Sequence, residues 1–265
     1  VFIDLLGFGI LIPVFPLLIT PGPFRVTPEG WSFTQGLIML GWLQAIYPFC
    51  MFIAAPILGQ LSDRHGRRPV LALSIFGTAV GYILFAIGIS TANLPLLFAA
   101  RALDGLTGGN LAVAQAAIGD ISTHENRAKN FGYMGAAFGL GFIIGPYLGG
   151  KLSSPSVSFY GLFHTPHWFG ATTPFWFAAV IAFMNCTAVL TTFPETIKEK
   201  FHGGKIKAGQ AISNVINGFK SDRLRVILFS GFLFSAGFTF FTTFFGVYLR
   251  NKFEFSSSKI GDYFA

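Results

Sequence analysis

The sequence has little charge: charged residues make up 11% of its 265 positions. Soluble domains average about 25% charged residues, so this composition could not easily provide a surface that faces water on all sides. Cysteine is also scarce, and both residues, Cys50 and Cys186, lie in apolar runs without metal-ligand spacing, which argues against a disulfide framework. The sequence contains no nucleophile–base set, no phosphate-binding loop and no metal cluster. We therefore expect neither an enzyme nor a bound cofactor or metal.

Long apolar runs are what the sequence has in abundance. A helix needs roughly 20 apolar residues to cross a hydrocarbon core about 30 Å thick, and the sequence offers seven such spans, with an eighth beginning near Ser258. The seven cover residues 1–18, 36–61, 69–89, 95–118, 128–152, 174–193 and 224–249. No ten-residue alternation indicates a barrel. The sequence therefore predicts an all-α, multi-pass membrane protein.

The basic residues are divided unevenly between the two sets of connections. One set carries twelve: Arg64, Arg67, Arg68, Arg127, Lys129, Lys198, Lys200, Lys205, Lys207, Lys220, Arg223 and Arg225. The other set carries five: Arg25, Lys151, Arg250, Lys252 and Lys259. Because cytoplasmic connections are enriched in Lys and Arg, we expect the first set of connections, and with it the N-terminus, to lie in the cytoplasm. The expected location of the protein is the plasma (bacterial inner) membrane. The net charge of +7 then reflects topology, and no nucleic-acid partner is expected.

Segment 194–223 is the longest and most charged connection. It predicts a cytoplasmic linker with an amphipathic surface helix at AISNVINGF. We expect a six-helix bundle over residues 1–193 before it, and the start of a second bundle, helix 7 and the beginning of helix 8, over residues 224–265. The sequence starts in an apolar run without the features of a signal peptide and ends in SSSKIGDYFA, as another run begins. The expected chain is thus a twelve-helix protein clipped at both ends.

Three charged residues, Asp4, Arg101 and Asp104, lie well within the spans. A charge at a helix centre costs about 2.5–3.5 kcal/mol, so such residues usually face a cavity or a partner. The simpler interpretation is that Arg101 and Asp104 only neutralise each other at i, i+3. The alternative is that they line a polar pathway: at 1.5 Å per residue, Asp104 lies roughly 15 Å below the helix end at Pro95, and Asp4 roughly 18 Å below Pro16. Two acids at similar depth could then share a cavity and exchange protons.

The span 128–152 is rich in glycine. The pairs spaced i, i+4 are Gly135/Gly139, Gly141/Gly145 and Gly145/Gly149. Such pairs form grooves for close helix packing, and Pro146 predicts a bend near the outer end. The helix is expected to pack tightly, and also to pivot against its neighbour.

The connection GQLSDRHGRRPVL, residues 59–71, resembles the signature cytoplasmic loop of the major facilitator superfamily, G-x-L-S-D-R-x-G-R-R-x-x-L. The matching residues are Gly59, Leu61, Ser62, Asp63, Arg64, Gly66, Arg67, Arg68 and Leu71. The resemblance implies that this loop is a gate, in which Asp63 latches the two halves of a transporter on the cytoplasmic side.

Three spans resemble the tetracycline-resistance-like drug:proton antiporters of that superfamily. The first matches through Asp4, Gly7, Gly9, Pro13 and Pro16, the fourth through Arg101 and Gly105 with Asp120 closing the helix, and the fifth through Gly141, Gly145, Pro146, Gly149 and Gly150. The fifth-helix motif is associated with antiporters rather than symporters. The resemblance implies that Arg101 takes part in proton coupling, and that the chain carries the N-terminal half of a monomeric exporter, whose partners are a small molecule, protons and the bilayer.

One position departs from the tetracycline pumps, which carry an acid in the third helix before a tyrosine. Here Gly81 precedes Tyr82, which favours an exporter of other small amphipathic molecules, with Asp104 as a candidate replacement for the missing acid. Two alternatives stay open: a sugar or metabolite transporter with the same fold, and a transport-inactive membrane scaffold or sensor. The substrate, the proton stoichiometry and the oligomeric state are not encoded in any motif found.

Overall fold

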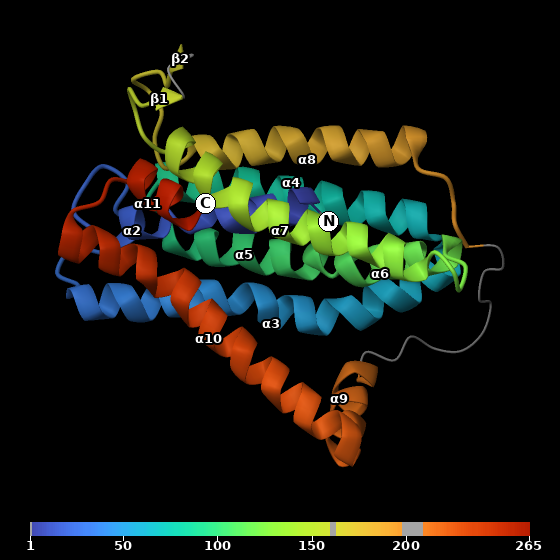
Figure 1. The fold of residues 1–265 in the computed structure, drawn as a ribbon. Coiled ribbons are helices and arrows are strands. Elements are labelled where there is room, and N and C mark those ends of the chain that lie inside the picture. The colour runs from blue at the N-terminus through green and yellow to red at the C-terminus, as the bar shows by residue number, and fades with distance from the viewer. Residues whose placement is uncertain (1, 160–162, 198–208) are drawn as a thin grey trace.

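The computed structural model describes residues 2–159, 163–197 and 209–265. Its long helices run side by side in a bundle, and one helix near the C-terminus leans away from the others (Figure 1). The helices are α1 (Phe2–Leu11), α2 (Phe15–Ile19), α3 (Phe33–His65), α4 (Arg67–Ser90), α5 (Leu94–Gly108), α6 (Asn110–Ile121), α7 (Arg127–Leu152), α8 (Thr173–Thr192), α9 (Gln210–Lys220), α10 (Asp222–Phe253) and α11 (Ser257–Phe264).

Five of the described helices, α3, α4, α7, α8 and α10, are long and apolar enough to cross a membrane. They coincide with five of the predicted spans. The other two predicted spans are each broken into two helices: residues 1–18 at Ile12–Val14, where Pro13 cannot donate a backbone hydrogen bond, and residues 95–118 at Gly109. Continuous helices across these two spans were therefore the wrong expectation, although the chain still follows the bundle through both.

The bundle is held together by apolar packing and by close contacts between α1 and α7. Phe85 of α4 packs on Phe175 of α8 with ring centroids 4.7 Å apart. A Cβ on Gly149 would lie 2.5 Å from the carbonyl oxygen of Ile10, so these two backbones touch. At Gly135 and Gly139 no described atom lies within 4 Å of a Cβ built at either position, so the groove predicted there stays a prediction.

The two ends of the bundle differ in structure. We call the end with connections 62–68 and 119–127 the motif end, and the end with connections 19–35 and 153–173 the hairpin end. The hairpin end contains a small departure from the predicted all-α fold, because β1 (Ser158–Phe159) pairs antiparallel with β2 (Phe163–His164).

Helix α10 joins the bundle at the hairpin end and stands away from it towards α9 (Figure 1). Helix α9 contains the predicted amphipathic segment. Arg250, near the end of α10, donates from Nε to Oγ1 of Thr20 at 3.0 Å, and α11 packs along α7. The C-terminal helices and the rest of the bundle therefore meet closely at the hairpin end.

Candidate functional site

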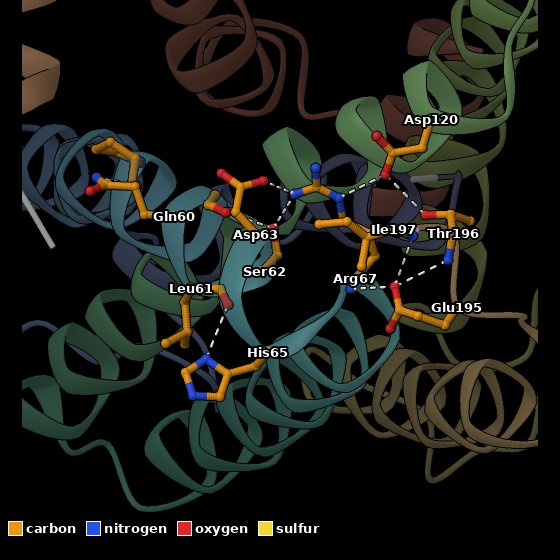
Figure 2. Close-up of polar contacts among 12 residues, drawn as sticks. Gln60, Leu61, Ser62, Asp63, His65, Arg67, Asp120, Glu195, Thr196 and Ile197 are labelled. Atoms are coloured by element: carbon orange, nitrogen blue, oxygen red, sulfur yellow. Dashed lines mark hydrogen bonds and ion pairs between the residues drawn. The ribbon is translucent and has the colours of Figure 1, made fainter. Parts of the chain in front are cut away.

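Arg67 is the centre of a charged network at the motif end (Figure 2). Its guanidinium is in ionic contact with Asp63 of α3 at 2.6 Å and with Asp120 of α6 at 3.0 Å. Nη1 of Arg67 also donates to Oγ of Ser62 at 2.6 Å. The arginine is only 6% exposed, whereas Asp63 and Asp120 keep 46% and 26% of their side chains exposed. The network therefore ties α3, α4 and α6 together through one buried cation.

Gly66 makes the sharp turn that brings this arginine into place. Helix α3 ends at His65 and α4 begins at Arg67, so one residue reverses the chain. Gly66 has φ +108°, a conformation that L side chains rarely adopt. By contrast, Gly59 was predicted to allow close approach, and no described atom lies within 4 Å of a Cβ built there. The turn therefore requires glycine at position 66, whereas the role predicted for Gly59 stays a prediction.

Glu195, just after α8, is part of the same site and was missed by the sequence analysis. Its Oε1 accepts from the backbone N–H of Arg67 at 2.8 Å, and its Oε2 from that of Arg68 at 3.3 Å. The carboxylate therefore caps the N-terminus of α4, where unpaired N–H groups and the helix dipole favour an anion. A Cβ on Gly66 would lie 2.2 Å from Oε2 of Glu195, so the glycine also makes room for this cap.

The electrostatics of Glu195 favour its charged form. Partial burial is the largest influence and opposes ionisation, but backbone hydrogen bonds from Arg67, Ile197, Arg68 and Thr196 together outweigh it and lower the pKa of the carboxyl below its ordinary value. Thr196 connects this cap to the arginine network, because its Oγ1 donates to Oδ2 of Asp120 at 3.2 Å. A signal in the sequence was present: an acid directly after an apolar span and Pro194.

Other residues of the loop have separate contacts. Nη2 of Arg68 donates to the carbonyl oxygen of Leu190, in the last turns of α8. Arg64 lies in the last turn of α3. Nδ1 of His65 lies 3.1 Å from the carbonyl oxygen of Leu61. The motif thus bonds chiefly to helices packed beside it, and Asp63 contacts Arg67 in this structure.

A second charged group, Arg101 and Asp104, lies inside the bundle on α5. Nη1 of Arg101 donates to Oδ2 of Asp104 at 2.9 Å, and the residues are 2% and 6% exposed. The guanidinium carbon stands 4.5 Å from the ring centroid of Tyr47, a cation–π contact. Among the residues that the structure describes, Nε and Nη2 of Arg101 have no hydrogen-bond partner. The predicted i, i+3 pairing is therefore present, and it leaves two buried donors of the arginine unused.

The ion pair borders a mainly apolar cavity of about 190 Å³. Phe8, Tyr47 and Gly108 line both this cavity and a small polar recess that contains Arg101 and Asp104. The remaining residues around the cavity are Leu5, Met51, Asn110, Leu111, Phe138 and Phe142. Side chains of α1, α3, α6 and α7 thus form an aromatic pocket, and the ion pair lies in the adjoining recess, which we call the charged wall.

The structure also locates the remaining predicted residues. Asp4 lies in α1, but its side chain is outside the described residues. Gly81 of α4 lies directly against Asp104, because a Cβ built at position 81 would be 3.3 Å from Cβ of Asp104. Asp104 therefore stands next to the space that an acid at position 81 would occupy.

The glycines predicted on the fifth span lie on two sides of α7. Gly141 and Gly145 pack on Leu5 and Leu6 of α1, with a Cβ at 141 only 2.7 Å from Cβ of Leu5. Gly9 of α1 meets the ring of Pro146, because a Cβ there would lie 2.7 Å from Cδ of that proline. Gly150 instead faces α11. Helix α7 therefore has a close contact with the first helix on one side and with the last helix on the other.

Comparison with known proteins gives one consistent result. The protein-family model described as Major Facilitator Superfamily matches residues 1–265. The class H tetracycline resistance protein of Pasteurella multocida is 32% identical over 98% of this chain and 59% of its own length. The class B protein of Escherichia coli is 36% identical over 73% of this chain and 42% of its own length.

A solved structure agrees with these sequence matches. The human organic anion transporter MFSD10 (TETRAN) superimposes with a TM-score of 0.70 at 24% identity, over 99% of this chain and 66% of that one, which shows a common fold. The chain spans about three fifths of the length of the class H relative. Together with the apolar helices, these matches establish a multi-pass membrane protein.

Proposed function

Since the chain belongs to the major facilitator superfamily, we propose that it is part of a proton-coupled antiporter that exports small amphipathic molecules by alternating access. The observation that carries the proposal is the buried Arg101–Asp104 pair in the wall beside an aromatic cavity. We assign residues 1–193 to a first six-helix bundle, 194–223 to a linker and 224–265 to the start of a second bundle. The class B and class H relatives are tetracycline resistance proteins, which supports export of a drug-like solute.

The cavity lining supports an amphipathic substrate over a sugar. Phe8, Phe138, Phe142 and Met51 offer apolar area and aromatic faces, which suit a solute with a ring system. A sugar needs many hydrogen-bonding partners, because its hydroxyl groups lose water on binding. The polar groups of this site are concentrated at the Arg101 end, so a solute with one polar edge and one apolar body fits best.

The charged wall provides a means of coupling. While Asp104 is ionised, its carboxylate holds Nη1 of Arg101. Protonation of Asp104 removes that attraction and changes both the charge and the shape of the recess next to the substrate. Proton binding and substrate binding then compete through the same wall, which is the requirement for antiport. We place Asp4 in the same role as a second acid on α1.

We propose that the motif end faces the cytoplasm and the hairpin end faces outwards, with the N-terminus inside. The uneven distribution of Lys and Arg supports this orientation. We further propose that the transporter is a monomer in a plasma (bacterial inner) membrane. Gly66, Arg67 and their partners would then form the cytoplasmic gate region.

Transport by the full-length gene product in inverted vesicles tests the proposal. An imposed proton gradient is expected to drive uptake of a fluorescent amphipathic drug, and Arg101→Ala or Asp104→Asn is expected to abolish proton-driven uptake. Arg127→Ala, which alters an exposed arginine at the motif end, is the matched control. If Asp4→Asn and Arg101→Ala both left proton-driven transport intact, the assigned roles would be wrong. Absence of any solute flux would instead favour a scaffold or sensor.

A second candidate function is transport of an amphipathic organic anion. Nε and Nη2 of buried Arg101, which have no partner in the described part of the chain, favour it, because a carboxylate can accept from both in a bidentate arrangement. The structural neighbour MFSD10 is an organic anion transporter. Flux of an aromatic carboxylate that follows the membrane potential and persists without a pH gradient would support this candidate over proton antiport.

A further inference from the structure

Lys151, in the last turn of α7, makes a buried ionic contact with a segment far away in the sequence. The residue is 8% exposed. Its Nζ lies 2.8 Å from Oδ2 of Asp262 and 2.9 Å from Oγ of Ser258, both on α11. In the sequence alone, Lys151 counts only as one of the charges that set orientation. A lysine that only sets orientation would face the solvent at the membrane surface. Burial and two bonds to another helix are not needed for that role.

The backbones beneath this contact touch each other. A Cβ on Gly150 would lie 2.5 Å from the carbonyl oxygen of Ser257, and a Cβ on Gly261 would lie 2.5 Å from that of Pro146. Helix α11 therefore lies against the end of α7 (Figure 1). Because Lys151 is enclosed by this packing, its pairing with Asp262 can persist only while the two helices remain together.

We infer that Lys151 and Asp262 form a latch that keeps the hairpin end closed, and that this latch opens when the substrate cavity opens towards that end. The inference rests on the proposed alternating access, with α7 in the first bundle and α11 in the second. When the helices separate, the ionic contact between Lys151 and Asp262 is replaced by contacts of each side chain with water. The free energy of the contact therefore helps to set the population of the open state. Lys151 is then a positioning residue, which touches neither substrate nor the reacting protons.

The geometry of the pair explains why a lysine suits this position. Besides its bonds to α11, Nζ of Lys151 lies 5.4 Å from the ring centroid of Tyr147. Asp262 keeps 47% of its side chain exposed, so water reaches the carboxylate and the pair is not sealed. A contact of this kind stabilises the closed state and can still dissociate.

Accessibility of the cavity from outside tests the latch. In the full-length gene product, Cys50 and Cys186 are replaced by serine, and Leu111→Cys places one thiol in the cavity wall. A membrane-impermeant maleimide is then added to right-side-out vesicles. Because Lys151 is buried and Asp262 half-exposed, Lys151→Met is expected to raise the labelling rate by roughly three- to tenfold, between the effects of exposed and buried pairs. Asp262→Asn is expected to raise the labelling rate as well. The double variant is expected to raise it no further than the single variant with the larger effect.

Two controls separate a latch from general damage. Lys259→Met alters an exposed lysine on α11 whose Nζ lies over the ring of Phe255, and it is expected to leave the labelling rate unchanged. Val113→Cys places the thiol at a fully buried position in α6, so its labelling would rise only if the bundle loosened. Lys151→Arg, which keeps the charge, is expected to restore most of the wild-type rate.

The outcomes are distinct. Unchanged labelling in both Lys151→Met and Asp262→Asn, additive effects of the two, or equal acceleration at Val113→Cys would overturn the latch. Labelling does not depend on net transport. A result in which the latch variants behave as expected but no proton-driven export occurs would therefore reject the proposed coupling and leave the latch in place.

Discussion

Buried cations stabilise both ends of the bundle, but they connect different parts of the chain. At the motif end, Arg67 contacts α3 and α6, and Glu195, which follows α8, caps the start of α4. All of these elements lie within residues 2–197. At the hairpin end, Lys151 connects α7 to α11, in a segment 111 residues away.

Under the proposed alternating access, this difference suits the two networks to different tasks. Contacts among helices of one bundle favour a rigid unit, because every partner moves with the others. A contact between two bundles must form and break during alternating access. We therefore expect substitutions of Arg67 and Glu195 to change chiefly the stability of the helices that form the proposed cytoplasmic gate region, and substitutions of Lys151 and Asp262 to change chiefly which side of the membrane the cavity faces.

The largest effect is expected from Arg67→Ala. Loss of one partner of a buried ion pair costs about 3–5 kcal/mol, and the exposure of Asp63 and Asp120 reduces the expected loss to roughly 2–4 kcal/mol. The melting temperature of the purified full-length gene product in detergent should fall by several degrees. Arg127→Ala, which removes an exposed arginine from the same end, should leave it unchanged. Equal melting temperatures for Arg67→Ala and wild type would contradict a structural role for the network.

A comparison of two glycines in the same motif should give the next largest effect. Gly66→Ala places a Cβ at φ +108° and within 2.2 Å of Oε2 of Glu195, which should cost about 1–3 kcal/mol. Gly59→Ala should be neutral or stabilise α3 by up to about 1 kcal/mol, because alanine is a better helix former. Thermal unfolding of the two variants side by side distinguishes a turn residue from a helix residue. Equal losses would mean that the turn at Gly66 tolerates a side chain.

Much of the fold could be predicted from apolar runs, because a span must be long and apolar wherever it lies in the chain. The predicted span 174–193 and the observed α8, Thr173–Thr192, differ by one residue at each end. The interruption at Gly109 was missed, since it depends on packing: a Cβ at Gly109 would lie 2.9 Å from Cα of Ala55 in α3. Local sequence does not record which helix will be the neighbour.

The candidate site could be predicted only where the contacting residues are close together in the sequence. The Arg101–Asp104 pair is local in sequence and could be anticipated from i, i+3 spacing. The cap by Glu195 joins residues 128 positions apart, and the latch joins Lys151 to a still different helix. Such pairings follow from the packing of whole helices, so a single sequence shows the charges without their partners. The position of Gly81 beside Asp104 likewise became visible only in three dimensions.

A smaller effect is expected when the cap of α4 is removed. Glu195→Ala leaves the backbone N–H groups of Arg67 and Arg68 without their carboxylate partner, and loss of a helix N-cap costs about 0.5–2 kcal/mol. Glu125→Ala, which alters an exposed acid at the same end, is the control for net charge. In the Glu195→Ala background, Gly66→Ala should cost less than it does alone, because the contact with Oε2 is gone while the unfavourable φ remains. Strict additivity of the two changes would argue against the contact.

The smallest effect concerns the pH dependence of that cap. Hydrogen bonds from the backbone hold the pKa of Glu195 below its ordinary value, which is about 4.3 for an unperturbed glutamate. The unfolded chain therefore binds a proton at higher pH than the folded one. The stabilisation from Glu195 is fully present above the unfolded pKa and is lost as pH falls through the lowered folded pKa.

The difference in melting temperature between wild type and Glu195→Gln isolates this contribution, because the other acids titrate in both proteins. That difference should stay constant from pH 7 to about pH 5 and shrink below about pH 4.3. Arg67 stays charged over this range in both proteins, so its own charge does not contribute to the change. A difference that stays constant down to pH 3, or that grows as the pH falls, would show that the carboxylate of Glu195 does not stabilise the start of α4 through its charge.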